Sequence, residues 1–273
     1  MEDVKLTEVV GAYRASRDYQ ALAPATRLNT DKALAKVGQF LDRPIRRLTR
    51  GVLMKLMDDM PSGSAYVFGT RMRALMKFAV DREYIEANPL AGTTMPTTGT
   101  IRPWTPNEMA AMTDKHEVHE QVRVAVVLAY YTGQRIGDVL RMKWSDITPQ
   151  DAIYVRQRKT NVELYIPIHP ALSGVLDTHP RLGDTIIADS HGQPYALNSF
   201  RRKFARTRDR LSLPKDLCFH GIRKTVACAL AANGATTEQI KAVGGWKTTK
   251  QVDGYTQGAD QFALAKGAMA RLL

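Results

Sequence analysis

The sequence predicts a mainly α-helical protein of two domains, with a small β-sheet in the second domain. Apolar residues recur every three or four positions over residues 6–80, which is typical of amphipathic helices. A stretch rich in Thr, Pro and Gly, residues 92–104, then interrupts the pattern and is typical of a linker. Beyond it, apolar and polar residues alternate over 162–168, which indicates one strand of a β-hairpin.

The first domain, residues 1–91, is expected to be a bundle of about four helices. Prolines separate its helical segments, at Pro24, at Pro44 and in the Pro61-Ser62-Gly63-Ser64 stretch. The last segment, about residues 64–82, carries three basic side chains opposite its apolar stripe: Arg71, Arg73 and Lys77. A solvated charged face is the ordinary explanation for them, and contact with a polyanion is the alternative.

The second domain, residues 105–273, opens on a helix start signal. In Thr105-Pro106-Asn107-Glu108, proline takes the first helical position and the first turn is acidic. The elements expected after it are helices over 122–131 and 136–142, a β-hairpin with strands at 152–158 and 162–168, and helices over 198–211, 220–232, 237–243 and 249–256. Lys159-Thr160-Asn161 would form the tip of the hairpin.

The charge of the chain favours a polyanionic partner. It has 39 Lys and Arg against 27 Asp and Glu, a net charge of +12, and its sequence pI is about 9.8. Nucleic acid is the first class of partner that suits this excess, and an acidic membrane surface is the second. A basic enzyme without such a partner is the alternative.

Cysteine content and hydropathy argue against other classes. Cys218 and Cys228 are the two cysteines, and without a Cys-x-x-Cys pair or a Cys–His cluster neither a disulfide framework nor a structural zinc site is indicated. The N-terminus does not have the pattern of a signal peptide, and no run of 18 apolar residues could span a membrane. We therefore expect a cytoplasmic protein that has no membrane partner.

Seven side chains of the second domain carry useful chemistry, and each alone also has an ordinary structural explanation, such as a surface ion pair, a solvated loop cation or a packed aromatic ring. They are Arg135, Asp138, Lys159, His220, Arg223, Trp246 and Tyr255. Their order and spacing are more specific than any one of them.

That order resembles the tyrosine recombinases of the phage integrase type. Residues 132–147, Thr-Gly-Gln-Arg-Ile-Gly-Asp-Val-Leu-Arg-Met-Lys-Trp-Ser-Asp-Ile, resemble the family's first catalytic box, which reads Thr-Gly-x-Arg, has an acid three residues later and ends on Trp-x-Asp-Ile. Lys159-Thr160, followed by the Tyr-Ile-Pro-Ile strand, is similar to its catalytic-lysine hairpin, and His220-Gly221-Ile222-Arg223 is similar to its His-x-x-Arg box. Tyr255, nine residues after Trp246, matches the spacing to the family's nucleophile.

The sequence departs from the common family pattern in two places. Gly244-Gly245-Trp246 stands where Leu-Gly-His is most frequent, and an indole N–H can donate to a phosphate but cannot exchange a proton. The first domain resembles the family's core-binding domain only in its helical pattern, and the arm-binding domain that many phage integrases carry ahead of it is expected to be absent from this chain.

The resemblance implies attack by Tyr255 on a DNA phosphodiester, giving a 3′-phosphotyrosyl intermediate. Arg135 and Arg223 would clamp the non-bridging oxygens of the transition state, with the Trp246 indole completing the cradle. His220 is the candidate base and Lys159 the candidate acid for the leaving 5′-oxygen. Asp138 would orient its neighbours. Because arginines would supply the positive charge, we expect neither a metal nor another cofactor.

The implied partner is double-stranded DNA that carries a specific target site. Four basic residues of the 198–211 helix would contact it together with the three of the first domain: Arg201, Arg202, Lys203, Arg206, Arg71, Arg73 and Lys77. The apolar tail after Tyr255, with Phe262, Leu264, Met269, Leu272 and Leu273, could pack on its own domain or on a neighbouring subunit. The expected assembly is a homo-tetramer on DNA, with accessory DNA-bending proteins as further possible partners.

Two other functions fit parts of the sequence. A type IB topoisomerase shares the chemistry but relaxes supercoils, and a catalytically silent DNA-binding regulator would keep only the fold. The separate helical domain and the apolar tail favour the recombinase over the first, and the complete residue set favours it over the second. Phage integrase, chromosome-dimer resolvase and transposon integrase are not separated by the sequence.

Overall fold

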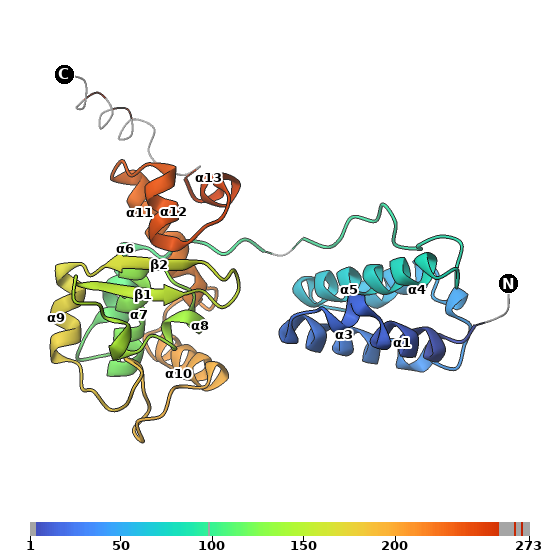
Figure 1. Cartoon of the computed structure of the whole chain (residues 1–273), viewed down its shortest axis with the longest axis horizontal. Helices are drawn as coiled ribbons and strands as arrows, with labels where there is room; N and C mark the ends of the chain where they lie inside the picture. The colour runs from blue at the N-terminus through green and yellow to red at the C-terminus, as the bar shows by residue number, and fades with distance from the viewer. Residues whose placement is uncertain (1–3, 98, 257–264, 266–268, 270–273) are drawn as a thin grey trace. The chain divides into compact units, whose positions relative to one another are not determined.

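A computed structural model describes residues 4–97, 99–256, 265 and 269 of the chain, except for the side chains of residues 251 and 254–256. The chain forms two compact units, Met1–Thr100 and Ile101–Leu273. The first is helical, and the second is helical with a small two-stranded sheet, which confirms the predicted fold class (Figure 1). No helix among the described residues has the length and apolar character needed to cross a membrane.

The first unit is a helical bundle built around its longest helix. Its helices are α1 (Leu6–Ala15), α2 (Arg17–Gln20), α3 (Pro24–Lys36), α4 (Arg50–Asp58) and α5 (Ser62–Asp81), with 3-10 turns at Gly38–Phe40 and Ile45–Arg47. Helix α5 contacts α1, α3 and α4. Its apolar stripe, including Phe68, Met72 and Leu75, is buried, as the periodicity of the sequence predicts.

The second unit surrounds one buried helix. Its elements are α6 (Pro106–Thr113), α7 (Glu120–Thr132), α8 (Ile136–Val139), β1 (Ala152–Arg156), β2 (Glu163–Pro167), α9 (Pro170–Thr178), α10 (Leu197–Arg210), α11 (Phe219–Ala232), α12 (Thr237–Gly244) and α13 (Thr249–Thr256), with a 3-10 turn at Trp144–Asp146. Helix α7 contacts α6, α8, α9, α10 and α11. Nine of the thirteen residues of α7 are therefore buried, and the segment after its end starts inside the unit.

Two details of the second unit differ from the sequence prediction. The helix expected over residues 136–142 ends at Val139 and is followed by a turn in which Met142 N donates to Val139 O (3.2 Å). Met142 O accepts a hydrogen bond from Ile186 N (2.9 Å), and Lys143 is extended. Helix α9 was not predicted at all. The hairpin is present, antiparallel, with Tyr154 opposite Tyr165 and Arg156 opposite Glu163.

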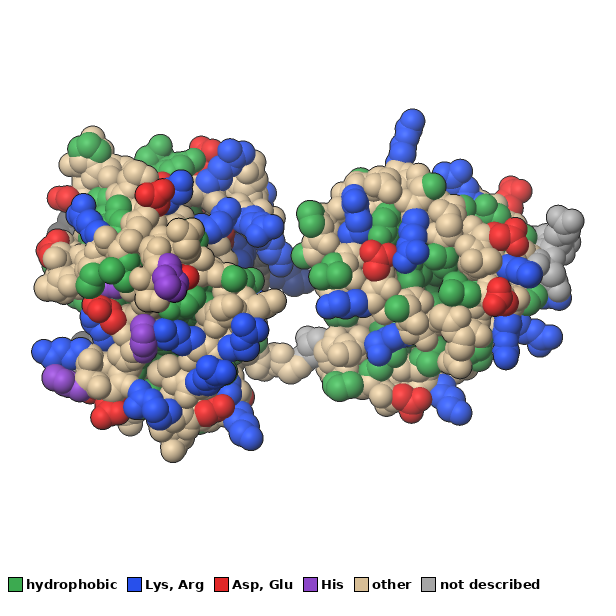
Figure 2. Space-filling model, turned by 90° about the horizontal axis from the view of Figure 1, so that it is seen from below, with side chains coloured by type: hydrophobic (Ala, Val, Ile, Leu, Met, Phe, Trp, Pro, Cys, Tyr) green, Lys and Arg blue, Asp and Glu red, His purple; other side chains and the backbone are tan. Residues whose placement is uncertain are grey.

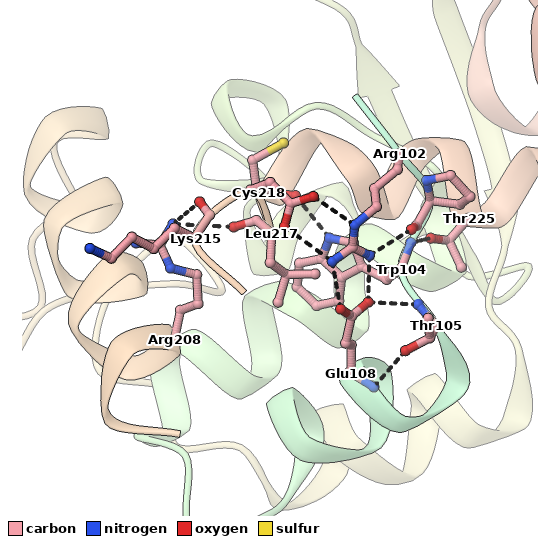
Figure 3. A network of polar contacts seen from close by, with 11 residues as sticks. Arg102, Trp104, Thr105, Glu108, Arg208, Lys215, Leu217, Cys218 and Thr225 are labelled. Atoms are coloured by element: carbon pink, nitrogen blue, oxygen red, sulfur yellow. Dashed lines mark hydrogen bonds and ion pairs between the residues drawn. The ribbon is translucent and has the colours of Figure 1, made fainter. Parts of the chain in front are cut away.

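The segment before α6 is held firmly on the second unit, so residues 101–104 of the expected linker belong to that unit (Figure 3). Trp104 N donates to Thr225 Oγ1 (2.7 Å), and the Trp104 indole donates to Cys218 O (2.9 Å) just before α11. A Cβ at Gly221 would lie 2.7 Å from the Trp104 ring and 2.8 Å from Arg102 O. Glycine in the His220-Gly221 pair thus lets this segment cross α11 closely.

An ion-pair network joins the same segment to two other parts of the second unit (Figure 3). The Arg102 guanidinium donates to both carboxylate oxygens of Glu108 (2.8 and 2.6 Å) and to both of Asp216 (2.8 and 3.2 Å). Glu108 is 7% exposed. The hydrogen bonds from Arg102, followed by backbone hydrogen bonding to Thr105, hold the pKa of the Glu108 carboxyl at about 2, against the opposing effect of burial.

We expect Glu108→Gln to lower the free energy of unfolding of the second unit by about 1–3 kcal/mol at neutral pH. Because the folded-state pKa is depressed, this contribution is complete above the unfolded-state pKa of 4.5 and is lost as the pH falls toward 2. Urea unfolding followed by tryptophan fluorescence measures it, since Trp104, Trp144 and Trp246 all lie in this unit. Glu117→Gln, at an exposed pair with Arg210, is the matched control, with an expected loss below about 0.5 kcal/mol. A parent–variant difference that stayed constant from pH 6 to 3 would contradict this assignment.

Candidate active site

Arg223 lies at the centre of the candidate site. It comes from the second turn of α11 and is 2% exposed. Its Nη1 group donates to Gly133 O, at the end of α7, and to Gly244 O, at the end of α12 (2.6 Å each). The Trp246 ring lies over the guanidinium, with its centroid 4.1 Å from Cζ. Arg223 therefore joins the ends of two helices and places Trp246 beside its own charge.

Arg135 enters the site because α7 ends just before it. It is half-buried, and its Nη1 group donates to the side-chain oxygen of Gln157 (3.1 Å) on the hairpin. The preceding residue, Gln134, is buried and donates to Val243 O (3.1 Å) near the end of α12. The first box is thus fixed to both the hairpin and α12.

His220 lies one turn before Arg223 on the same face of α11. Although part of the ring is open to solvent, the pKa of His220 is lowered, first by desolvation and then by the positive charges of Arg223, Arg135 and Lys159. A lowered pKa keeps the imidazole neutral at pH 7, as a general base requires. Arg135 and Arg223 are joined through Gln157 and the Gly244 carbonyl, and His220 lies one turn from Arg223, so the structure brings these parts of the two boxes together.

Lys159 is exposed at the tip of the hairpin, as the sequence predicts. The tip is a tight turn in which Asn161 N donates to Gln157 O (2.8 Å) and Gln157 N donates to Val162 O (2.8 Å). Asn161 has a φ of 55°, a left-handed conformation that asparagine tolerates well. The turn presents the Lys159 side chain to solvent, two residues after Gln157.

Asp138 contacts the hairpin. Its buried carboxylate accepts hydrogen bonds from Arg141 Nη2 (3.0 Å) and from Arg158 N (3.0 Å). Asp138 therefore holds the backbone next to Lys159.

Gln157 is the residue of this site that sequence reasoning missed. It is fully buried and contacts Gln134, Arg135, Thr160 and Gly244. The sequence pattern could have identified it. The inward face of this strand and its extension carries Ile153, Val155 and Gln157, and a glutamine on a buried face needs polar partners.

Tyr255 lies in α13, whose backbone contacts α11 and α12 (Figure 1). The side chain of Tyr255 is outside the described part of the structure. Of the apolar tail residues predicted to pack on their own domain or on a neighbouring subunit, Met269 is described and exposed. Phe262, Leu264, Leu272 and Leu273 lie outside the described residues.

The predicted DNA-contacting side chains differ in their exposure and in their intramolecular contacts. Lys and Arg side chains outnumber acidic ones on the faces visible in Figure 2. Arg201, Arg202 and Arg206 on α10 are exposed. The Lys203 ammonium lies 2.9 Å from His119 Nε2 and 3.0 Å from the Tyr195 hydroxyl. These contacts hold α10 on its own unit, and the DNA contact of Lys203 stays a prediction.

On α5 of the first unit, Arg73 also has intramolecular partners. Its guanidinium donates to Leu90 O (3.2 Å) and to Thr93 O, so it fastens the chain that leaves the bundle. Lys77 is exposed and pairs with Asp81 (2.5 Å), and Arg71 is half-buried. Sequence periodicity assigned all three to a polar face, but only tertiary contacts decide which of them meet solvent.

Comparison with known proteins agrees with this site. Residues 104–261 match the profile of the phage integrase family, more than half of the chain. The chain belongs to this family. The integrase of Enterobacteria phage 434 is 30% identical over 182 residues, which cover 61% of this chain and 51% of that protein. The integrase of Escherichia phage lambda is 40% identical over 96 residues, 32% of this chain and 27% of that protein. The matched region thus spans about half or less of these relatives' length.

Solved structures extend the likeness to both units. A lambda integrase dimer bound to a COC′ core site has a TM-score of 0.80 at 25% identity, covering 92% of this chain and 95% of that one. The Tn1549 transposon integrase in complex with transposon right end DNA has a TM-score of 0.78 at 16% identity, covering 98% of this chain and 99% of that one. At that identity the second likeness concerns the fold alone.

We expect Arg135→Gln to raise the pKa of His220 toward its ordinary value of 6.5, because one of the cations that disfavour imidazolium is removed. An NMR titration of the His220 ring in parent and variant measures the shift. Arg210→Gln serves as the control, because Arg210 pairs with Glu117 and is not among the charges that shift His220. A His220 pKa that did not respond to Arg135→Gln would show that the two side chains do not share a site.

Proposed function

We propose that this protein is a site-specific DNA recombinase that cleaves and rejoins strands through a 3′-phosphotyrosyl intermediate. The observation that carries the proposal is the hydrogen-bonded link from Arg135 to Arg223 through Gln157 and Gly244 O, inside the region that matches the phage integrase family. His220 lies one turn from Arg223 on α11, and Lys159 lies on the same hairpin as Gln157. The phage relatives favour integration and excision of a viral genome as the biological role.

The proposed reaction assigns one task to each side chain. Tyr255 Oη attacks the scissile phosphorus while neutral His220 accepts the phenolic proton. Arg135 and Arg223 stabilise the charge that develops on the non-bridging oxygens, and the Trp246 N–H adds a further donor. Lys159 gives its proton to the departing 5′-oxygen. The phosphotyrosyl bond keeps the energy of the cleaved ester, so rejoining to another strand needs no ATP.

DNA binding and assembly complete the proposal. The exposed arginines of α10, Arg201, Arg202 and Arg206, are suited to phosphates of a duplex that carries the target site. A lambda integrase structure with the same fold contains a tetramer bound to a Holliday junction. For this chain we propose the same kind of assembly, with the tail after Tyr255 docking on a neighbouring subunit, acting in the host cytoplasm where the DNA lies.

Replacing the nucleophile tests the proposal directly. Tyr255→Phe deletes one oxygen and should abolish the covalent protein–DNA adduct on a nicked suicide substrate, while the dissociation constant for DNA changes by less than about 3-fold. Denaturing gels measure the adduct, and gel shifts measure binding. Tyr165→Phe is the matched control, since Tyr165 is 69% exposed on β2, and should form adduct like the parent. An adduct formed by the Tyr255→Phe variant would identify another nucleophile.

Changing the leaving group of the substrate tests whether Lys159 transfers a proton or acts only through its charge. Lys159→Ala should slow cleavage of an ordinary phosphodiester by ~10²–10⁴-fold, because an alkoxide needs a proton as it departs. On a 5′-bridging phosphorothiolate a thiolate leaves unaided, so the variant should cleave nearly as fast as the parent. Lys115→Ala, at another exposed lysine of the same unit, should leave both rates unchanged. Equal defects of Lys159→Ala on the two substrates would reduce Lys159 to an electrostatic contact.

A further inference from the structure

Gln157 has an unusual position for an amide side chain. It lies just after β1, is 0% exposed, and uses its full hydrogen-bonding capacity. Its oxygen accepts from Arg135 Nη1 (3.1 Å) and Thr160 Oγ1 (2.6 Å). Its nitrogen donates to Gln134 Oε1 and to Gly244 O (2.7 Å each). Two accepted and two donated bonds fix both the position and the orientation of the amide.

These four partners come from three separate segments of the candidate site. Gln134 and Arg135 belong to the first box, Thr160 follows Lys159 at the hairpin tip, and Gly244 ends α12. Gly244 O also accepts from Arg223, so one carbonyl links the Gln157 amide to the buried guanidinium. A single side chain thus connects the surroundings of both arginines and of the lysine.

The packing around the amide supports this connection independently. Gly245 has a φ of 66°, and a Cβ there would lie 2.6 Å from Gln157 Nε2 and 2.9 Å from its Cδ. Glycine at this position allows the α12 end and the hairpin to approach to hydrogen-bonding distance. Any larger residue would force the amide away from the Gly244 carbonyl.

We propose that Gln157 is a positioning residue that sets the orientation of the Arg135 guanidinium and the hairpin carrying Lys159 relative to Arg223. The inference rests on the proposed function, because it assigns Gln157 a part in the same strand cleavage. Gln157 is buried and acts through Arg135 and Thr160. Preorganised donors lose much of their effect when they can reorient, so the amide contributes to rate without contacting DNA.

The decisive variant is Gln157→Met, which keeps the length of the side chain and removes all four hydrogen bonds. We expect the single-turnover rate of adduct formation to fall by about 10–100-fold on an ordinary phosphodiester, with DNA affinity within about 3-fold of the parent. A methylphosphonate at the scissile position carries no charge for Arg135 to neutralise. On that substrate the defect should shrink to about 5-fold or less, which general loss of folding would not produce.

Two further variants keep the test decisive if Gln157→Met folds poorly. Thr160→Val removes only the hydroxyl donor of the 2.6 Å bond and should slow phosphodiester cleavage by about 3–10-fold without changing the melting temperature. Gln121→Met makes the same exchange at another buried glutamine, eleven residues or about 16 Å along α7 from Thr132, and should leave the cleavage rate unchanged.

The outcomes separate this inference from the proposed function. A parent protein that forms no adduct overturns the proposed recombinase activity and, with it, the positioning role. A parent that forms adduct while Gln157→Met is equally slowed on both substrates, or Thr160→Val is as fast as the parent, overturns the positioning role alone. A cleavage rate of Gln157→Met that falls on the charged phosphodiester but much less on the methylphosphonate supports the positioning role.

Discussion

Burying a guanidinium costs several kcal/mol unless its charge and its N–H groups are compensated, and Arg223 is 2% exposed. Its compensation comes from two carbonyls, Gly133 O and Gly244 O, and from the face of the Trp246 ring. Both carbonyls lie at helix C-termini, where backbone acceptors lack intrahelical partners and the helix dipole is negative. The ends of α7 and α12 thus stabilise the charge, and the charge in turn holds these two ends together.

The other site residues follow from this arrangement by proximity along the chain. Arg135 comes two residues after Gly133, and Trp246 comes two residues after Gly244. His220 shares the face of α11 that carries Arg223. The hairpin is not adjacent in sequence to either carbonyl, and Gln157 joins it to Gly244. Truncating Arg223 would remove the Arg223 donor from both carbonyls, although Gly244 O would keep its hydrogen bond from Gln157, and would disturb geometry as well as charge.

The sequence was sufficient to predict most of the helices, the hairpin and the positions of the catalytic boxes, because apolar periodicity and box spacing are local properties of the chain. It did not show the tertiary partners of individual side chains. Arg73 and Lys203 lie on polar helix faces, and in the structure Arg73 contacts backbone carbonyls while Lys203 contacts His119 and Tyr195. Asp138 binds Arg141, a pair that the i,i+3 spacing allows, and also the hairpin backbone at Arg158 N, which no spacing rule specifies. Helix α9 was missed although Pro170 marks its start, since only Leu172 and Leu176 of its nine residues are buried.

The contrast between Arg223 and Lys159 fits the different demands of charge stabilisation and proton transfer. Charge on non-bridging oxygens develops at a fixed place, so a donor held by packing and by two carbonyls loses little energy to reorientation. A departing oxygen moves as its bond to phosphorus breaks, and its proton donor has to follow it. An exposed lysine on a four-carbon chain at a hairpin tip can make that movement. Asp138 and Gln157 fix the backbone at the tip of the hairpin through Arg158 N and Thr160 Oγ1, on either side of Lys159. The backbone around the lysine is thereby held in place while its side chain keeps the freedom that proton delivery requires.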